Sequence, residues 1–300
     1  MREIDVVAQI RKFAVATPKG RELVQGIGDD CAILRPRAKQ DLVFTTDFVL
    51  EGRHFTLGTH SAADIGHKAL ARSLSDLAAM GSTPVFCLVS LAVPSHLASR
   101  WVGGFYRGLL SLAQRYGTAL VGGDLAQFDS VVADVMCCGR VPQGRALLRS
   151  GARPGDRIYV TGELGGSARG LAAKRGKHWK RHLRPEPRIA AGLALRRFYV
   201  SACMDLSDGL ALDLHRLCLE SGVSAELNGS LPIARGASLD EALRGGEDYE
   251  LLFTAPARAH IPPAITGIPV TGIGTVVSGR EGSIQFGGRL LPVGGFDHFA

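Results

Sequence analysis

The sequence lacks the features that mark secreted and membrane proteins. Its six cysteines form no Cys-x-x-Cys pair and lie mostly in apolar runs, as small buried hydrophobic residues do, which argues against a disulfide framework. No run of 18 apolar residues is present, and the charged residues 1–11 lack the apolar stretch of a signal peptide. We therefore expect a cytoplasmic protein that has no membrane contact.

The common short signatures of catalytic and nucleotide sites are absent as well. There is no G-x-x-x-x-G-K-[ST] motif, and the isolated Gly26-x-Gly28 is followed by acidic residues where a dinucleotide-binding loop needs a third glycine. Neither G-x-S-x-G nor H-E-x-x-H occurs, and the nine histidines show no metal-ligand spacing. These absences exclude a P-loop and a Rossmann dinucleotide site.

What the sequence does contain is typical of a folded, glycine-rich protein. Of its 300 residues, 46% are hydrophobic and 21% are charged, which excludes a disordered chain and fits one large domain or two ordinary ones. Its 38 glycines are nearly double the usual share of about 7%. The net charge is +7, and the basic residues are concentrated only in the run 174–182. We interpret that run as either a solvated loop or a binding patch.

The order of apolar runs and turn residues predicts two α/β domains, residues 1–142 and 143–300. In the first, a helix should begin at the Ser61 to Asp64 capping box and end at Gly81. The other elements expected there are strands at 41–49, 85–93, 119–121 and 131–141, and a helix at 94–116 that ends before Gly117. Turn residues cluster at 142–155, which marks the boundary.

The second domain continues the α/β pattern. Its expected elements are a strand at 157–161, a glycine-rich turn at 162–166 followed by a helix, a strand end at 202–204, a helix at 209–220 that Gly222 ends, and a β-hairpin at 284–291. The hairpin is predicted because a Gly-Gly pair stands between two apolar runs.

Several aspartates stand at the ends of strand-like runs, beside glycine or on the first helix: Asp30, Asp47, Asp76, Asp124, Asp205 and Asp208. Each alone could be a helix cap, an Asx turn or a glycine-loop residue, and Asp76 could pair with Arg72 one helical turn away. Together they indicate a shared site, because α/β sheets bind ligands at strand ends. Convergent carboxylates in a low-dielectric pocket need either neutralising cations or raised pKa values, and oxygen donors without a His or Cys cluster favour Mg²⁺. Since Mg²⁺ commonly binds with substrate phosphates, the expected substrate is a nucleotide.

A set of motifs in one order covers nearly the whole chain. The motifs are Gly26-Ile-Gly-Asp-Asp30, Thr45-Thr-Asp47, Glu51-Gly-Arg-His-Phe55, residues 68–81, Gly122-Gly-Asp124, residues 149–156, Asp205-Leu-Ser-Asp-Gly209, residues 245–251 and residues 295–299. Together they resemble the thiamine-monophosphate kinase family of the aminoimidazole ribonucleotide synthetase-like superfamily. The resemblance implies a two-domain α/β (α+β) fold in which each domain is a mixed sheet with helices. It also implies ATP-dependent phosphorylation of thiamine monophosphate to thiamine diphosphate.

The same resemblance implies roles for individual residues. The Mg²⁺ ligands would be Asp30, Thr45, Thr46, Asp47, Asp76, Asp124, Asp205 and Asp208. ATP would contact Tyr106, Gly123, Asp124, Arg149 and Ser207, and thiamine monophosphate would contact His54, Glu247, Asp248 and Phe296. It further implies several Mg²⁺ ions, a homodimer formed through the N-terminal domains, and ATP held between the two domains of a chain. The C-terminal domain would complete that site.

The chemistry expected at such a site is electrostatic. The acceptor is a phosphate monoester with a second pKa of about 6, so at neutral pH it is largely ionised and needs no catalytic base. The obstacle is repulsion between two polyanions, which Mg²⁺ and Arg149 would screen while aligning an in-line transfer. Asp47, Asp124 and Arg149 are therefore the expected catalytic residues, and the aspartates would hold metal ions rather than take protons.

Two kinds of alternative remain open: another enzyme of the same superfamily, and a nucleic-acid-binding protein. A selenophosphate synthetase would need a reactive cysteine in an N-terminal glycine-rich loop, and a hydrogenase maturation enzyme a C-terminal cysteine. This chain has only Cys31 near the first position and ends in Ala300. A basic nucleic-acid-binding protein would show salt-dependent affinity and no turnover of Mg²⁺-ATP. The sequence also departs from the family pattern at two positions. Leu125 stands where Thr is common, which puts one nucleotide contact in question, and Arg53 stands within the Glu51–Phe55 motif.

Overall fold

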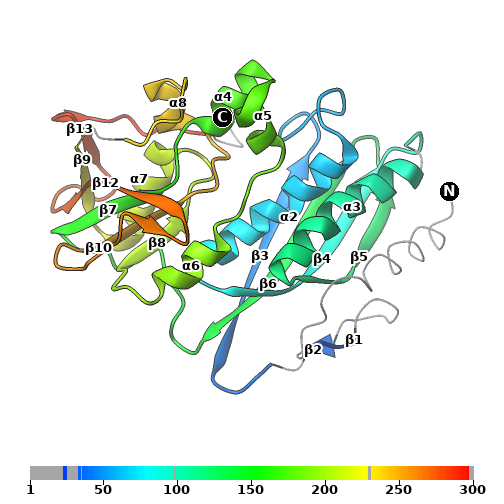
Figure 1. The fold of residues 1–300 in the computed structure, drawn as a ribbon, viewed down its shortest axis with the longest axis horizontal. Coiled ribbons are helices and arrows are strands. Elements are labelled where there is room, and N and C mark those ends of the chain that lie inside the picture. The colour runs from blue at the N-terminus through cyan, green and yellow to red at the C-terminus, as the bar shows by residue number, and fades with distance from the viewer. Residues whose placement is uncertain (1–22, 26–32, 35, 98, 229–230, 297–300) are drawn as a thin grey trace. The chain divides into compact units, whose positions relative to one another are not determined.

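The computed structural model describes residues 23–25, 33–34, 36–97, 99–228 and 231–296. The chain divides into two compact units. Unit 1 extends to Leu77 and continues over Thr83–Gly144, and unit 2 comprises Ala78–Ser82 and the residues from Arg145 onward. Each unit has a sheet and helices, so the expected α/β class is confirmed (Figure 1).

Unit 1 is built on a four-stranded mixed sheet in the order β3-β6-β4-β5. Its strands are β3 (Gln40–Leu50), β4 (Thr83–Val93), β5 (Ala119–Gln127) and β6 (Val132–Pro142). β6 is antiparallel to β3 and β4, whereas β4 and β5 are parallel and are joined by α3 (Ser99–Tyr116). A parallel pair requires such a crossover connection. A separate antiparallel ribbon pairs β1 (Leu23–Gln25) with β2 (Ile33–Leu34).

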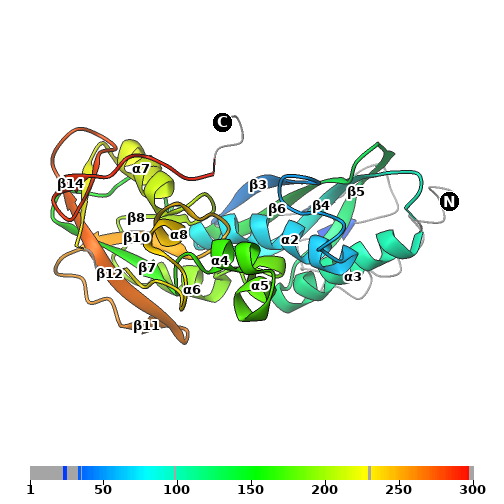
Figure 2. The same cartoon turned by 90° about the horizontal axis from the view of Figure 1, so that it is seen from above.

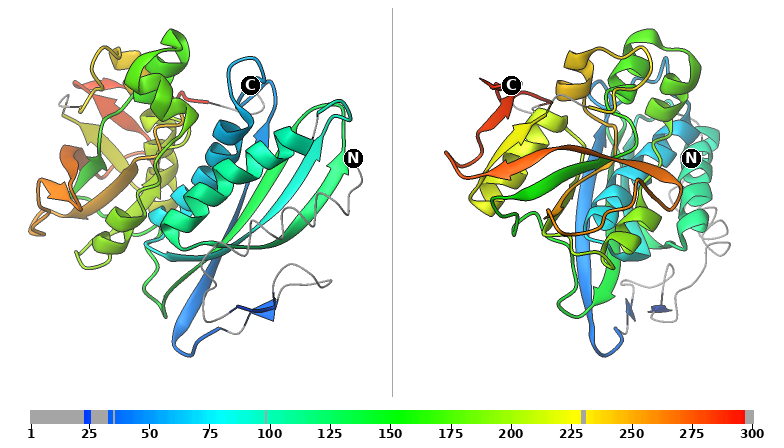
Figure 3. Two further views of the ribbon diagram at one scale, coloured as in Figure 1. Left: turned by 45° about the vertical axis from the view of Figure 1, so that its right-hand side comes forward. Right: turned by 60° about the vertical axis from the view of Figure 1, so that its left-hand side comes forward.

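Helices α2 (Ala62–Ala79) and α3 cover one face of this sheet (Figures 2 and 3). The predicted capping box is confirmed: the Ser61 N–H donates to the Asp64 carboxylate and the Asp64 N–H donates to the Ser61 hydroxyl, both at 3.2 Å. The helices approach closely where Gly66 has no side chain, because a Cβ there would lie 1.9 Å from the carbonyl oxygen of Phe105. In the described part of unit 1, α2 and α3 both lie on this one face of the sheet.

Two elements of unit 1 differ from the prediction. Residues 94–97 form a turn, in which the Leu97 N–H donates to the Pro94 carbonyl, so α3 does not begin at Pro94. β5 extends to Gln127, which places Gly122-Gly-Asp124 within a strand rather than in a loop after it. Gly123 permits this pairing because a Cβ at that position would lie 2.0 Å from the carbonyl oxygen of Val89 on β4.

Unit 2 contains a larger mixed sheet in the order β14-β13-β9-β12-β7-β10-β8, with β11 beside β12. The strands are β7 (Asp156–Thr161), β8 (Ala202–Asp205), β9 (Ser224–Leu227), β10 (Leu251–Pro256), β11 (Ala264–Ile265), β12 (Ile268–Val277), β13 (Ile284–Phe286) and β14 (Arg289–Leu290). The helices are α4 (Gly166–Ala173), α5 (Gly176–Leu183), α6 (Ile189–Leu195), α7 (Leu210–Ser221) and α8 (Leu239–Arg244).

Several local predictions for unit 2 are confirmed. α7 ends at Gly222, whose φ of 66° is the left-handed cap that glycine favours. The β13–β14 hairpin turns through Gly287 and Gly288, both at positive φ, as a tight primed turn requires. The apolar side of α7 joins the core of the unit through Leu210, Leu214 and Leu217.

The prediction of a solvated loop at 174–182 is wrong. Most of that run forms α5, which lies beside α4 (Figures 1 and 2). Two of its basic side chains, Arg181 and His182, have buried partners in unit 2, and His182 is only 3% exposed. Tertiary contacts therefore stabilise a helix that the local charge pattern did not indicate.

Two further observations concern membranes and cysteines. In the described part of the chain, no helix is both long and apolar enough to cross a membrane. The five cysteines of that part are free and buried, while Cys31 lies outside it.

Candidate active site

The helix-covered face of unit 1 brings Thr45 and Asp47 of β3 to Arg72 and Asp76 of α2. Successive residues of a strand point to opposite faces of the sheet, so positions 45 and 47 share this face. The Thr45 hydroxyl donates to the Asp76 carboxylate. The Arg72 Nη2 lies 3.5 Å from Asp47 Oδ1. Three of the predicted metal ligands, Thr45, Asp47 and Asp76, are thus close together and supply only oxygen donors.

The electrostatics of this cluster fit a cation site. Burial, together with the negative charge of Asp76, raises the pKa of Asp47 to about 7, and Arg72 opposes the shift. Two carboxylates, of which Asp47 pairs with the Arg72 guanidinium, leave unbalanced negative charge, which a hard cation with oxygen ligands would neutralise. No group of three or more His, Cys, Asp or Glu side chains in metal-binding positions is found among the described residues, and Asp30 lies outside them.

Asp124 lies on the other face of the sheet. Phe48, Ser90, Asp124 and Asp134 stand opposite one another across the four strands. The four also line one small hollow of about 100 Å³. Phe48 is 57% exposed on this face. The side chain of Thr46 points the same way, since its hydroxyl donates to Asp134 at 2.5 Å.

The structure therefore separates Asp124 from Asp47 within one chain. Asp47 pairs with Val135 of β6, and the sheet order places β6 and β4 between β3 and β5. With neighbouring strands about 4.8 Å apart, the two backbones are roughly 14 Å apart. Magnesium ligands lie at about 2.1 Å from the ion. These two residues cannot hold the same ion inside a single chain.

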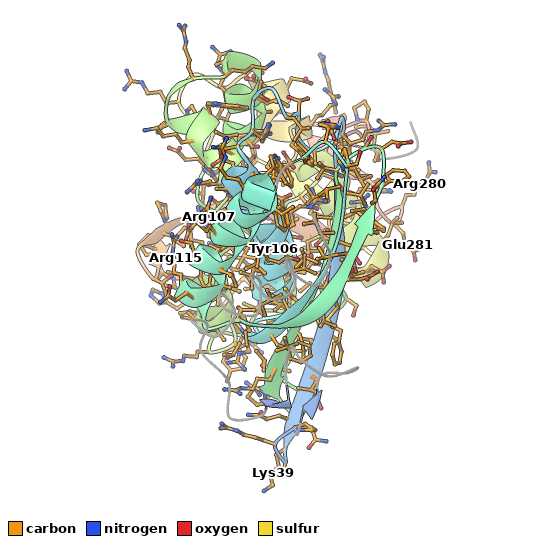
Figure 4. The ribbon with its side chains drawn as sticks, turned by 90° about the vertical axis from the view of Figure 1, so that its right-hand side faces the viewer. Lys39, Tyr106, Arg107, Arg115, Arg280 and Glu281 are labelled. Atoms are coloured by element: carbon orange, nitrogen blue, oxygen red, sulfur yellow. The ribbon has the colours of Figure 1, made fainter. Side chains whose placement is uncertain are left out.

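His54 and Tyr106 are both buried. The His54 Nδ1 accepts the Leu50 N–H at 3.0 Å, and the His54 carbonyl accepts from the buried Lys68 ammonium at 3.3 Å. Tyr106 is 3% exposed, and burial raises its pKa above the usual range. It lies on the side of α3 turned to the interior, whereas Arg107 projects outward (Figure 4). A nucleotide contact of Tyr106 stays a prediction.

In unit 2 the predicted residues gather at the turn between β8 and α7. Asp205 is the last residue of β8 and is 3% exposed. The Glu247 N–H donates to the Ser207 carbonyl at 2.7 Å, and the Phe296 N–H donates to the Asp208 carbonyl at 2.9 Å. Residues predicted to bind the nucleotide and residues predicted to bind thiamine monophosphate thus meet at this one turn.

Asp213 is a residue of this turn that the sequence reasoning missed. Its carboxylate accepts the backbone N–H groups of Ser207, Asp208 and Gly209 at 3.0–3.1 Å. Burial, together with the charge of Asp208, raises the pKa of Asp213 to about 7. Arg216 bridges the two carboxylates, at 2.5 Å from Asp208 and 3.1 Å from Asp213. The sequence signal that could have identified Asp213 was its position four residues after Gly209, in the first turn of α7.

Glu247 and Asp248 have different surroundings. The Asp248 carboxylate accepts the N–H groups of Gly165 and Ser167 at 2.5 and 3.0 Å, so it holds the start of α4. Burial raises its pKa to about 6, although Arg181 lowers it. The Glu247 side chain is 18% exposed. Of the two, Glu247 has the more exposed side chain.

Arg149 lies in an exposed loop of unit 2. Its carbonyl accepts the Ser221 hydroxyl at 3.0 Å, which attaches the loop to the end of α7. The side chain is exposed. A contact between Arg149 and ATP stays a prediction, as does the contact of Gly123.

A helix-backed mixed sheet followed by a second α/β unit defines the class to which this chain belongs. The family model for the N-terminal domain of AIR synthase related proteins matches residues 28–141, and the model for the C-terminal domain matches residues 153–287. The chain is a member of the AIR synthase related family.

Within this family the chain groups with the thiamine-monophosphate kinases. It is 42% identical over 303 residues to thiamine-monophosphate kinase of Salmonella typhimurium, with 92% of both proteins covered. The crystal structure of thiamine-monophosphate kinase from Stenotrophomonas maltophilia K279a matches with a TM-score of 0.84 and 35% identity, over 97% of this chain and 98% of that one. A structure of AaThiL complexed with AMPPCP and TMP matches with a TM-score of 0.80 and 30% identity, over 100% and 99%. Hydrogenase maturation protein HypE of E. coli, at 20% identity, shares the fold alone.

Proposed function

We propose that this chain transfers the γ-phosphate of ATP to thiamine monophosphate and forms thiamine diphosphate. The observation that carries the proposal is the 42% identity to a thiamine-monophosphate kinase over 92% of the chain. A second support is the likeness, at 30% identity, to a relative complexed with AMPPCP and TMP. The hydrogenase maturation alternative has only a shared fold in its favour.

The test is direct product analysis. Purified protein with Mg²⁺-ATP and thiamine monophosphate should form thiamine diphosphate and ADP in equal amounts, measured by chromatography. Release of ADP without the diphosphate would contradict the proposal and favour a sibling activity.

Magnesium is part of the proposal. The oxygen donors of Thr45, Asp47 and Asp76 fit a hard cation, and the raised pKa of Asp47 marks the negative charge that such a cation would neutralise. Asp205 and Asp208 are the proposed donors from unit 2. Mg²⁺ would supply charge screening of the phosphates when bound.

The chain's own residues then have binding and orienting roles. The acceptor phosphate is already ionised at neutral pH, so no residue has to remove a proton from it. Arg149 is proposed to bind an ATP phosphate, which a guanidinium does in a fixed orientation. Glu247 and Phe296 are proposed to face the positively charged ring of thiamine monophosphate, through charge and through the aromatic face. That ATP contacts residues of both units stays a prediction.

We further propose a homodimer in which a second copy supplies Asp124. Among the strands that the structure describes, β3 and β5 are the two edges of the unit 1 sheet, and sheet edges are natural places for a second chain to add. A copy that places its β5 beside β3, with its sheet turned over so that its Asp124 points to the helix-covered side of β3, would bring that Asp124 near Asp47.

We also propose that the protein works in the cytoplasm. The five cysteines of the described residues are free thiols, which a reducing compartment preserves. Thiamine monophosphate and ATP would both be available there.

A further inference from the structure

The basic run 174–182, which the proposed chemistry does not use, contacts the segment that carries Glu247. Arg181 on α5 donates from Nη2 to the Asp248 carbonyl at 2.9 Å and to Glu250 Oε1 at 2.6 Å. His182 on the same helix has Nδ1 3.3 Å from Glu247 Oε2. One short helix thus reaches three of the four residues from 247 to 250.

This segment has a backbone that must be held in place. Glu247 and Tyr249 have φ values of 64° and 49°, a left-handed conformation that is unfavourable for residues other than glycine. Such a conformation persists only where surrounding contacts determine it, and it is found mostly at functional sites. The contacts from α5 are among those that determine it here.

The neighbouring acids are already satisfied by structural partners. Asp248 accepts two backbone N–H groups of the α4 start. Glu250 is fully buried and pairs with Arg181 and Arg188, at 2.6 and 2.5 Å, while the Thr161 hydroxyl donates to it at 2.7 Å. These bonds fix the chain on one side of Glu247 and leave its partly exposed carboxylate to interact with a ligand.

The ring of His182 is itself fixed in orientation. It is 3% exposed, its Nδ1 lies 2.8 Å from the Ser167 hydroxyl, and it stacks on Trp179 with ring centroids 5.3 Å apart. Because the buried ring is held by Ser167 and Trp179, it can fix the orientation of the Glu247 carboxylate beside it.

We propose that His182 is a positioning residue: it holds the Glu247 carboxylate toward the positively charged ring of the acceptor substrate, so that α5 sets the affinity for thiamine monophosphate. This inference rests on the proposed function. It assigns a role in acceptor recognition to a helix that carries no motif residue.

Three variants of the full-length protein test it. His182→Phe keeps an aromatic ring against Trp179 but removes Nδ1 and with it the contacts to Glu247 and Ser167, and His182→Asn offers an amide near the position of Nδ1. Lys180→Ala, an exposed site on the same helix, is the matched control. We expect His182→Phe to raise the KM for thiamine monophosphate about tenfold, the loss expected when a charged group loses one polar partner. The kcat and the KM for ATP should stay within about twofold, His182→Asn should recover most of the loss, and Lys180→Ala should match the wild type.

Calorimetric binding of thiamine monophosphate, in the presence of a non-hydrolysable ATP analogue, separates the two proposals. Wild-type protein that binds no thiamine monophosphate would overturn the proposed function. Wild-type binding that His182→Phe leaves unchanged would overturn only the role of His182. His182→Phe could instead lower kcat and thermal stability and raise the KM for both substrates. If His182→Asn then recovers none of these, His182 has only a structural role, and the positioning role is overturned.

Discussion

Asp47 and Asp124 lie on opposite faces of the unit 1 sheet and on its two opposite edge strands. Asp47 faces α2 and pairs with Arg72, whereas Asp124 stands in the row of Phe48 and Asp134. The sequence motifs predict that both act on the same Mg²⁺ cluster. Strand alternation within one chain opposes this, and the homodimer proposed above, in which a second copy supplies Asp124, would account for it.

Subunit mixing should therefore restore activity. Asp47→Asn and Asp124→Asn are each expected to be inactive alone. In a randomly reassociated mixture half of the dimers pair the two variants, and each such dimer has one site with both native aspartates, so about a quarter of the wild-type activity should return. The measurement is the rate of thiamine diphosphate formation after co-refolding. Continued inactivity of the mixture, with heterodimers shown by mass spectrometry, would assign both residues to one chain.

Asp47→Asn should also report whether a base is used. If Asp47 holds Mg²⁺, kcat should fall about a hundredfold or more at every pH, because metal binding to phosphates contributes several kcal/mol. The pH-rate profile of the residual activity should keep its shape. The exposed Asp129 offers the matched control, and Asp129→Asn should leave kcat unchanged. A shifted optimum with a retained maximum would instead make Asp47 a proton acceptor.

The burial of Asp248 should appear in the pH dependence of stability. Its folded pKa is raised from 3.8 to about 6, so between these values the folded state binds more protons than the unfolded state. The free energy of unfolding should therefore fall as pH rises through this window, by roughly 3 kcal/mol at most. Urea unfolding at several pH values measures the slope. Asp248→Asn should have a flatter profile than the wild type, and an identical slope in both would refute the assignment.

Glu250 should be one of the most sensitive positions in unit 2. Its fully buried carboxylate pairs with Arg181 and Arg188, so Glu250→Gln leaves two guanidinium groups without their charge partner. We expect a loss of about 3–5 kcal/mol in the free energy of unfolding. The exposed ion pair of Asp240 with Arg244 is the control, and Asp240→Asn should lose less than about 1 kcal/mol. Equal losses at the two sites would show that burial is not the cause.

Local structure was predictable wherever neighbouring residues decide it. The capping box at Ser61 and the glycine pair of the β13–β14 hairpin act within a few residues, and both are confirmed. Helix α5 (Gly176–Leu183) was missed because its stability depends on contacts with Glu250, which lies far along the chain, and with Ser167 on α4. The extension of β5 was missed because glycine usually ends a strand, whereas here Gly123 allows close pairing with β4.

The candidate site divides in the same way. Residue types and their order determined the family, the expected substrates and most candidate ligands, because carboxylates beside glycine carry the same chemistry wherever the chain places them. Only the tertiary structure decided that Asp124 faces away from Asp47, that Asp248 holds α4, and that Asp213 and His182 support the residues beside them. The reason is physical: a motif specifies which atoms a residue offers, whereas the sheet face, the burial and the partner of each side chain depend on segments distant in the sequence.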